Sequence, residues 1–322
     1  MSFALALLAL AAFATARDPE YRPVASPGDH QESLDVGGIT RTFIVHVPPG
    51  FDGKSKVPVV FMLHGAGGSG AGSDLETGWG AKADHEGFIA VFPDGNPVRP
   101  QLPARFLGNP RIWNDGSGRG IEKADDLGFV SAMIDYVEAR YSADPERIYC
   151  TGFSNGASMT FSVGVNLSSR IAAVAPVSGH LWYRGKQLAY PVPLLFIVGT
   201  EDPLNPIAGG DVKLPWGNTQ YHPPIADSLK EWERMLGCGP QVITASTRKG
   251  VDEVTYDQCA KGGEVVYYTV NGLGHIWPGG QHRLPEKWVG KPSNELDATE
   301  VIWEFFKAHP RAAASTLARK AS

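Results

Sequence analysis

The stretch RIYCTGFSNGA, residues 147–157, decides the fold. Its first six residues form an apolar, β-rich run that predicts a buried strand, and a helical segment follows the stretch directly. In between, Ser154 stands between Gly152-Phe153 and Asn155-Gly156, a pattern that places a serine on a sharp strand-to-helix turn. Glycine is needed on both sides because a side chain there would collide with neighbouring backbone. The stretch therefore predicts an exposed nucleophilic serine above the positive end of a helix.

Outward from this turn, between residues 40 and 310, short β-rich runs alternate with helix-length segments. Several of the runs are apolar almost throughout, as in strands that are buried on both faces. This alternation predicts one domain with a mostly parallel sheet and helices on both faces, the α/β architecture of the α/β-hydrolase fold. The predicted strands cover 41–47, 57–63, 88–93, 147–152, 172–177, 193–199 and 264–270, the predicted helices 125–140, 226–236 and 297–307, and two long loops 94–124 and 203–222.

An acid and a histidine follow later strands in the order that this fold uses. Asp202 comes after the strand at 193–199 and is the candidate that would orient the histidine, with Glu201 as its neighbouring rival. His275 lies in a glycine-rich loop after the last strand and is the candidate general base. With Ser154 as nucleophile, these residues predict a serine hydrolase whose activity falls at low pH, because only neutral imidazole accepts a proton.

The glycine-rich segment after the strand at 57–63 predicts the site that stabilises negative charge on the substrate oxygen. We assign the two backbone N–H donors to Ala66 and Asn155, with His64 as a support of the loop. The segment lacks the lysine and the Ser/Thr of a phosphate-binding loop. The histidines are dispersed and the cysteines are not at ligand spacing, so we expect no metal and no cofactor.

With these residues in place, the chain resembles the extracellular esterase family that includes polyhydroxybutyrate depolymerases and feruloyl esterases. The resemblance runs from about residue 41 to residue 309 and implies a Ser-Asp-His carboxylesterase. It is carried by six pieces in order: Leu63-His64-Gly65, Val91-Phe92-Pro93-Asp94-Gly95, Trp113-Asn114-Asp115-Gly116, Asp125-Asp126-Leu127-Gly128-Phe129, Gly152-Phe153-Ser154-Asn155-Gly156-Ala157 and Gly274-His275-Ile276-Trp277-Pro278-Gly279.

The substrate expectation follows from the resemblance. By analogy, Trp113 and Trp277 form aromatic walls of the pocket, which suits a flat phenolic acyl group such as ferulate; both are equally open to a role in the core. The chain lacks a recognisable linker and substrate-binding domain, so soluble, oligomeric or wall-bound phenolic esters are favoured over crystalline polymer. A polyhydroxybutyrate depolymerase or oligomer hydrolase, a serine peptidase and a non-catalytic binding protein remain as alternatives.

The N-terminus and the cysteines predict an exported protein. Residues 1–16 form a short apolar run ending in Ala14-Thr15-Ala16, which predicts a signal peptide cleaved before a catalytic domain at 17–310. Residues 311–322 have no core-forming pattern and are expected to be disordered. Cys238 and Cys259 are expected to form a disulfide, and Cys150 to be buried. The mild net charge of −5 and the scattered Lys and Arg argue against nucleic acid as a partner, no membrane span is expected, and the oligomeric state is left open.

Overall fold

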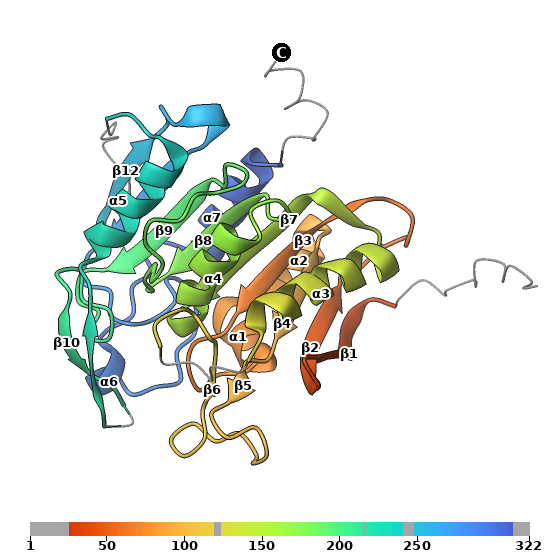
Figure 1. The fold of residues 1–322 in the computed structure, drawn as a ribbon, viewed down its shortest axis with the longest axis horizontal. Helices are drawn as coiled ribbons and strands as arrows, with labels where there is room; N and C mark the ends of the chain where they lie inside the picture. The colour runs from red at the N-terminus through yellow and green to blue at the C-terminus, as the bar shows by residue number, and fades with distance from the viewer. Residues whose placement is uncertain (1–25, 119–123, 216, 241–247, 312–322) are drawn as a thin grey trace, which may run out of the picture.

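The computed structural model describes residues 26–118, 124–215, 217–240 and 248–311. Nine strands form a central sheet in the order β1-β2-β4-β3-β7-β8-β9-β13-β12 (Figure 1). The pairings from β4 through β13 are parallel, whereas β1–β2, β2–β4 and β12–β13 are antiparallel. The predicted, mostly parallel sheet is thereby confirmed. The strands are β1 (Gly28–Val36), β2 (Ile39–Val47), β3 (Val57–Leu63), β4 (Ile89–Pro93), β7 (Ala143–Phe153), β8 (Ala173–Val177), β9 (Leu194–Gly199), β12 (Val251–Tyr256) and β13 (Val265–Val270).

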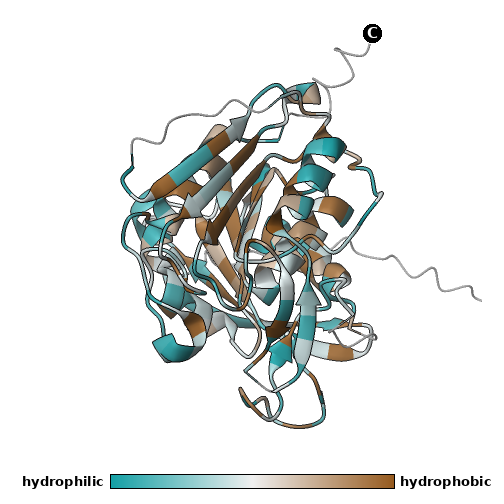
Figure 2. Ribbon diagram, turned by 90° about the vertical axis from the view of Figure 1, so that its left-hand side faces the viewer, coloured by the Kyte–Doolittle hydropathy of each residue, from teal (hydrophilic) through white to brown (hydrophobic). Residues whose placement is uncertain are grey.

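Helices cover both faces of the sheet. The helices are α1 (Gly70–Thr77), α2 (Trp79–Glu86), α3 (Asp126–Arg140), α4 (Asn155–Asn166), α5 (Ile225–Leu236), α6 (Glu286–Val289) and α7 (Ala298–Ala308), with a 3₁₀ turn at Ala260–Gly262. Because successive side chains of a strand point to opposite faces, neighbouring residues of one strand pack into different cores. In β3, Phe61 packs into the core beneath α3, α4 and α5, whereas its neighbour Met62 packs into the core beneath α2 and α7. Figure 2 shows the hydrophobic residues running along the inner strands.

The two stretches predicted as long loops each contain a small hairpin. β5 (Asn96–Pro97) pairs with β6 (Arg111–Ile112), and β10 (Gly210–Lys213) pairs with β11 (Thr219–His222). Both hairpins lie outside the central sheet. Strands of two to four residues are too short to produce a periodic pattern, so neither hairpin could be recognised from the sequence.

The sheet also has two strands that were not predicted, β1 and β12, and both are edges. β1 alternates half-buried and exposed residues along its whole length, and its sequence GDHQESLDV is mainly polar. Only a few of its side chains, among them Leu34 and Val36, pack against the core. A polar edge strand of this kind lacks the hydrophobic alternation by which strands are recognised, and polarity at an edge discourages pairing with another chain.

The termini and cysteines complete the comparison with the predictions. The predicted signal peptide at 1–16 and residues 312–322 lie outside the described residues. Arg311, the first residue of the predicted tail, donates its backbone N–H to the Glu146 carbonyl at 2.7 Å. The predicted disulfide between Cys238 and Cys259 is present, and Cys150 is buried. Within the part of the chain that is described, none of the helices is both long and apolar enough to cross a bilayer.

Candidate active site

Ser154 occupies the strained turn that the sequence predicts, between β7 and α4. Its φ of 57° and ψ of −118° are unusual for a residue with a side chain. The turn is held by the Ser154 N–H, which donates to the Val177 carbonyl at 3.0 Å. Glycine is required at 156, because a Cβ there would stand 2.1 Å from the Leu63 carbonyl oxygen, and at 152, where it would stand 2.5 Å from the Gly156 oxygen. As the N-cap residue of α4, Ser154 lies at the positive end of the helix.

Asp202 follows β9 and is buried, and its two carboxylate oxygens have separate partners. Oδ1 accepts the backbone N–H groups of Leu204 and Asn205, each at 2.8 Å. Oδ2 lies 2.8 Å from Nδ1 of His275. Burial alone would raise the pKa of Asp202, but the charge of His275 and these hydrogen bonds outweigh burial and hold the pKa below its usual range. The carboxylate is therefore ionised and can only accept hydrogen bonds.

His275 links this carboxylate to the serine. Because Asp202 accepts from Nδ1–H, the neutral ring carries its proton on Nδ1 and leaves Nε2 as an acceptor, 2.8 Å from the Oγ of Ser154. The ring of Phe153 packs against the imidazole with 4.7 Å between ring centroids. Gly274 allows the backbone at 289–290 to pass close by, since a Cβ there would stand 2.1 Å from the Val289 oxygen. In this arrangement Nε2 can take the hydroxyl proton of the serine.

The glycine-rich loop after β3 lies beside Ser154. A Cβ added at Gly65 would stand only 3.3 Å from the Cβ of Ser154, and residues 65–69 line the pocket together with Asn155. Asn155 is the first residue of α4, so its backbone N–H has no acceptor within the helix. Ala66 and Asn155, the residues predicted to supply the two backbone donors, therefore both line the cavity that contains Ser154.

His64 and Trp113 hold this loop from below. Nδ1–H of His64 donates to the Gly65 carbonyl at 2.7 Å, and Nε2 accepts the Gly95 N–H at 2.9 Å. Burial lowers the pKa of His64 to about 4, which keeps the ring neutral and suited to these two roles. The indole N–H of Trp113 donates to the His64 carbonyl at 2.9 Å.

The side chain of Asn155 connects the serine turn to the segment 113–115. Its Oδ1 accepts the backbone N–H of Trp113 at 2.7 Å, and its Nδ2 donates to Oδ2 of Asp115 at 2.7 Å. Gly67 is tied to β6, which directly precedes that segment, through its N–H, which donates to the Arg111 carbonyl at 2.7 Å. Residues 111–115 therefore hold both the loop after β3 and the start of α4.

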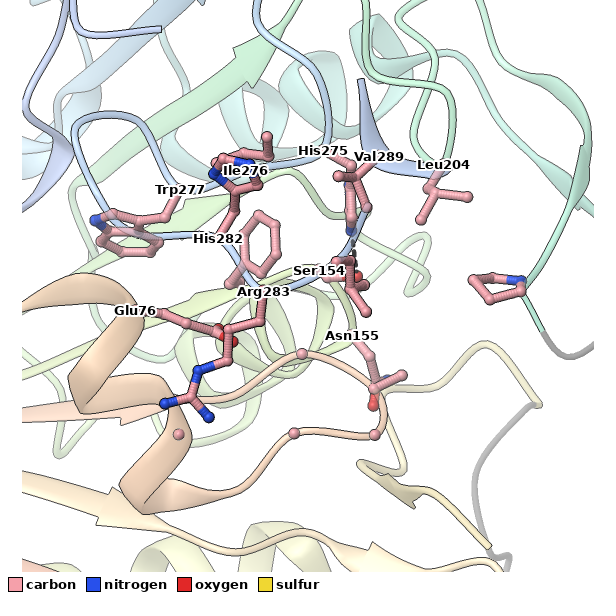
Figure 3. A pocket seen from close by; sticks show the side chains of 18 of the residues that line it. Glu76, Ser154, Asn155, Leu204, His275, Ile276, Trp277, His282, Arg283 and Val289 are labelled. Carbon is pink, nitrogen blue, oxygen red and sulfur yellow. Dashed lines mark hydrogen bonds between the residues drawn. The ribbon is translucent and has the colours of Figure 1, made fainter. Parts of the chain in front are cut away.

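A cavity of about 310 Å³ opens above Ser154 and His275 (Figure 3). Its size lies at the lower end of the range for small-molecule sites. The lining combines aromatic and aliphatic side chains, including Phe106, Phe153 and Leu204, with a few polar ones. The cavity gives a substrate direct access to the serine hydroxyl.

The two predicted tryptophan walls have different positions. Trp277 lines the cavity, and its indole N–H donates to Thr299 Oγ1 at 3.0 Å. Trp113 is fully buried and is not among the lining residues, so its expected place in the pocket wall is corrected. Its hydrogen bond to the His64 carbonyl turns the ring under the loop instead.

Sequence reasoning missed Glu76 and Arg283, which also line the cavity. Glu76 lies near the end of a helix that was not predicted, and Arg283 lies thirteen residues after the last strand. Neither belongs to a recognisable motif. The one sequence feature that could have drawn attention to them is their charge, in segments adjacent to Gly-rich motifs.

The described residues contain no group of three or more His, Cys, Asp or Glu that could hold a metal ion.

The sheet, the serine turn and the hydrogen-bonded Ser-His-Asp arrangement define an α/β-hydrolase. A model of the phospholipase/carboxylesterase family matches residues 52–213, half of the chain. The protein belongs to this family, which places it among the carboxylic ester hydrolases. The region matched includes Ser154 and Asp202 and ends before His275.

Individual relatives agree with the family. The chain is 26% identical over 301 residues to a putative esterase, NocK, of Nocardia uniformis, with 89% of this chain and 85% of the relative covered. It is 31% identical over 240 residues to feruloyl esterase B of Piromyces equi, covering 73% of this chain but only 42% of that longer relative. The structure of an acetyl xylan esterase from Aspergillus awamori superimposes with a TM-score of 0.53 at 15% identity, covering 77% of this chain and 94% of the other. The last comparison supports the fold alone.

Proposed function

We propose that this protein is a serine carboxylesterase in which Ser154 is the nucleophile, His275 the general base and Asp202 the residue that orients the histidine. The observation that carries the proposal is the continuous chain of hydrogen bonds from Asp202 through His275 to Ser154, at the floor of an accessible cavity. Such a chain activates a hydroxyl that is otherwise a weak nucleophile.

The proposed reaction has two halves. Ser154 Oγ attacks the ester carbonyl while its proton passes to Nε2 of His275, and the negative oxygen accepts the N–H groups of Ala66 and Asn155. The C–O bond of the ester then breaks, the alcohol leaves with the proton from His275, and the acyl group stays on the serine. Water, deprotonated by the same imidazole, attacks the acyl-enzyme and releases the acid.

For the substrate, we propose phenolic esters such as feruloyl esters. Three aromatic rings that line the cavity, those of Phe106, Phe153 and Trp277, support a flat acyl group. The similarity to a feruloyl esterase supports the same class. Trp113, the other residue expected to form the wall, supports the cavity only indirectly, through its hydrogen bond to the loop at 64–65.

We also propose that the protein is exported after cleavage of residues 1–16. The disulfide between Cys238 and Cys259 supports this proposal, because such bonds persist in oxidising compartments. Expression of the full chain in a secreting host, followed by N-terminal sequencing of the medium fraction, tests it. A mature protein beginning at Arg17 is expected, and an uncleaved chain retained in the cells would refute it.

The esterase proposal is tested with purified protein and three substrates side by side: methyl ferulate, a short-acyl nitrophenyl ester and hydroxybutyrate oligomers. We expect methyl ferulate to give the highest kcat/KM, and Ser154→Ala to lose activity on all three. Preference for the oligomers would instead identify an oligomer hydrolase. A matched ester and amide separate an esterase from a peptidase, and failure of a fluorophosphonate to label Ser154 would favour a non-catalytic binding protein.

A further inference from the structure

The cavity has two chemically different sides. Figure 3 shows the side chains of Glu76, Trp277, His282 and Arg283 together on one side of Ser154, whereas Leu204 lies on the other. Leu214 and Pro215 also line the cavity, and they are apolar like Leu204. The serine chemistry described above uses none of the charged groups on the first side.

Glu76 is the central group of this polar side. The side chain is partly exposed where it lines the cavity, and no hydrogen bond or ion pair among the described residues involves its carboxylate. Burial raises the pKa of Glu76, and the nearby positive charge of Arg283 opposes that rise. A carboxylate that borders a cavity without a protein partner can accept a hydrogen bond from a bound ligand, and its partial burial makes that bond stronger than the same bond in open solvent.

A backbone hydrogen bond fixes the position of Glu76 in the chain. Its carbonyl accepts the N–H of Gln281 at 2.9 Å, which ties the end of α1 to the loop that carries Arg283. Gly280 permits this contact, because a Cβ there would stand 2.3 Å from the Glu76 carbonyl oxygen. The indole of Trp277 is held by Thr299, whose hydroxyl in turn donates to the Thr77 carbonyl at 2.7 Å. The polar side is thus a preformed part of the cavity.

The charges on this side select the kind of ligand. Among the described residues that line the cavity, Glu76 is the single carboxylate, and Arg283 is the arginine on the same side; Nε of Arg111, the other arginine of the lining, lies 3.6 Å from Oδ1 of Asp94. A cationic ligand group would be repelled by Arg283, and an anionic one by Glu76. A neutral hydroxyl group suits both neighbours, because it donates to a carboxylate and accepts from a guanidinium.

We infer that Glu76 and Arg283 bind a free hydroxyl group that the substrate carries at a distance from its ester bond. This inference rests on the proposed esterase function and narrows its substrate class to hydroxylated esters. Glu76 accepts a hydrogen bond from the hydroxyl, Arg283 donates one to it, and Trp277 lies alongside the ligand. The hydroxyl belongs either to a phenolic acyl group or to a sugar on the alcohol side, and the two sources are distinguished experimentally.

The test uses two matched pairs of esters. Methyl ferulate and methyl 3,4-dimethoxycinnamate differ in the phenolic hydroxyl. The 5-feruloyl esters of methyl arabinofuranoside and of its 2,3-dideoxy analogue differ in the sugar hydroxyls. We expect kcat/KM of the full-length enzyme to favour the hydroxylated member of one pair by about tenfold, as for a hydrogen bond to a charged group. The pair that shows the preference identifies the source of the hydroxyl.

The variants Glu76→Met and Arg283→Met are expected to lower this preference to about twofold or less, mainly by slowing the hydroxylated ester. Glu76→Gln keeps an acceptor oxygen and is expected to retain part of the preference. Glu304→Met is the matched control, since Glu304 is exposed on α7 and pairs with Lys307. Absence of discrimination in both pairs, or an equal loss on both members in Glu76→Met, overturns the inference. Loss of all activity in Ser154→Ala tests the esterase proposal separately.

Discussion

Replacement of Asp202 by asparagine is the most direct test of how the catalytic histidine is oriented. The carboxylate receives two backbone N–H groups on Oδ1, from Leu204 and Asn205. The asparagine oxygen is therefore expected to take the place of Oδ1, and the NH₂ group then faces Nδ1 of His275. Since NH₂ can only donate, Nδ1 must become the acceptor, and the ring proton moves to Nε2.

With its proton on Nε2, the ring has no lone pair for the serine hydroxyl. We expect kcat to fall by about four orders of magnitude, the effect of the same tautomer change in serine proteases, which corresponds to about 5 kcal/mol in the activation barrier. KM for a small ester is expected to change little, because Asp202 does not line the cavity.

Steady-state hydrolysis of a nitrophenyl ester measures the effect, and thermal unfolding confirms that the variant is folded. Glu201→Gln is the matched control, since Glu201 is exposed and adjacent in sequence. It is expected to stay within about twofold of the parent enzyme. A folded Asp202→Asn variant that keeps more than a tenth of the activity would refute the proposed role of Asp202.

Three further results concern stability. The pKa of His64 is about 4 in the folded protein against 6.5 for an ordinary histidine, so the unfolded chain takes up the proton first as the pH falls. In urea titrations, the free energy of unfolding should therefore fall by about 3 kcal/mol more between pH 7 and pH 4 in the parent than in His64→Gln. Parallel pH profiles of the two proteins would contradict this. Reduction of the Cys238–Cys259 bond is expected to lower the free energy of unfolding by about 3 kcal/mol in urea titrations with and without reductant. Gly156→Ala should lose about 3 kcal/mol or fail to fold because of its clash with β3, whereas Gly108→Ala, with no atom within 4 Å, should unfold like the parent.

The interior of the fold could be predicted from the sequence because its strands are apolar on both faces. The predicted strand at 57–63 agrees with β3, and the predicted helix at 125–140 differs from α3 by one residue. The edge strand β1 was missed because polar residues dominate it. Helices α1 and α2 were missed as well, because they are only eight residues long and carry few apolar side chains.

In the site, the residues that could be predicted are those whose position follows from the end of a strand. Ser154, Asp202 and His275 follow β7, β9 and β13, and the structure brings their polar atoms into hydrogen-bonding distance. The lining of the cavity could not be predicted in the same way. The indole of Trp113 points into the core, where its N–H donates to the His64 carbonyl. The carboxylate of Glu76 reaches the cavity from a helix that carries no recognisable motif.

The link from Asn155 to Trp113 and Asp115 matters for attempts to engineer this enzyme. Libraries that aim at new acyl preferences would naturally randomise the protruding segment around Phe106, which borders the cavity. Changes confined to residues 98–108 leave the anchor at 113–115 in place and should alter selectivity without slowing turnover. Insertions or deletions closer to the anchor would shift the backbone amide of Asn155 itself. Selectivity and kcat would then change together.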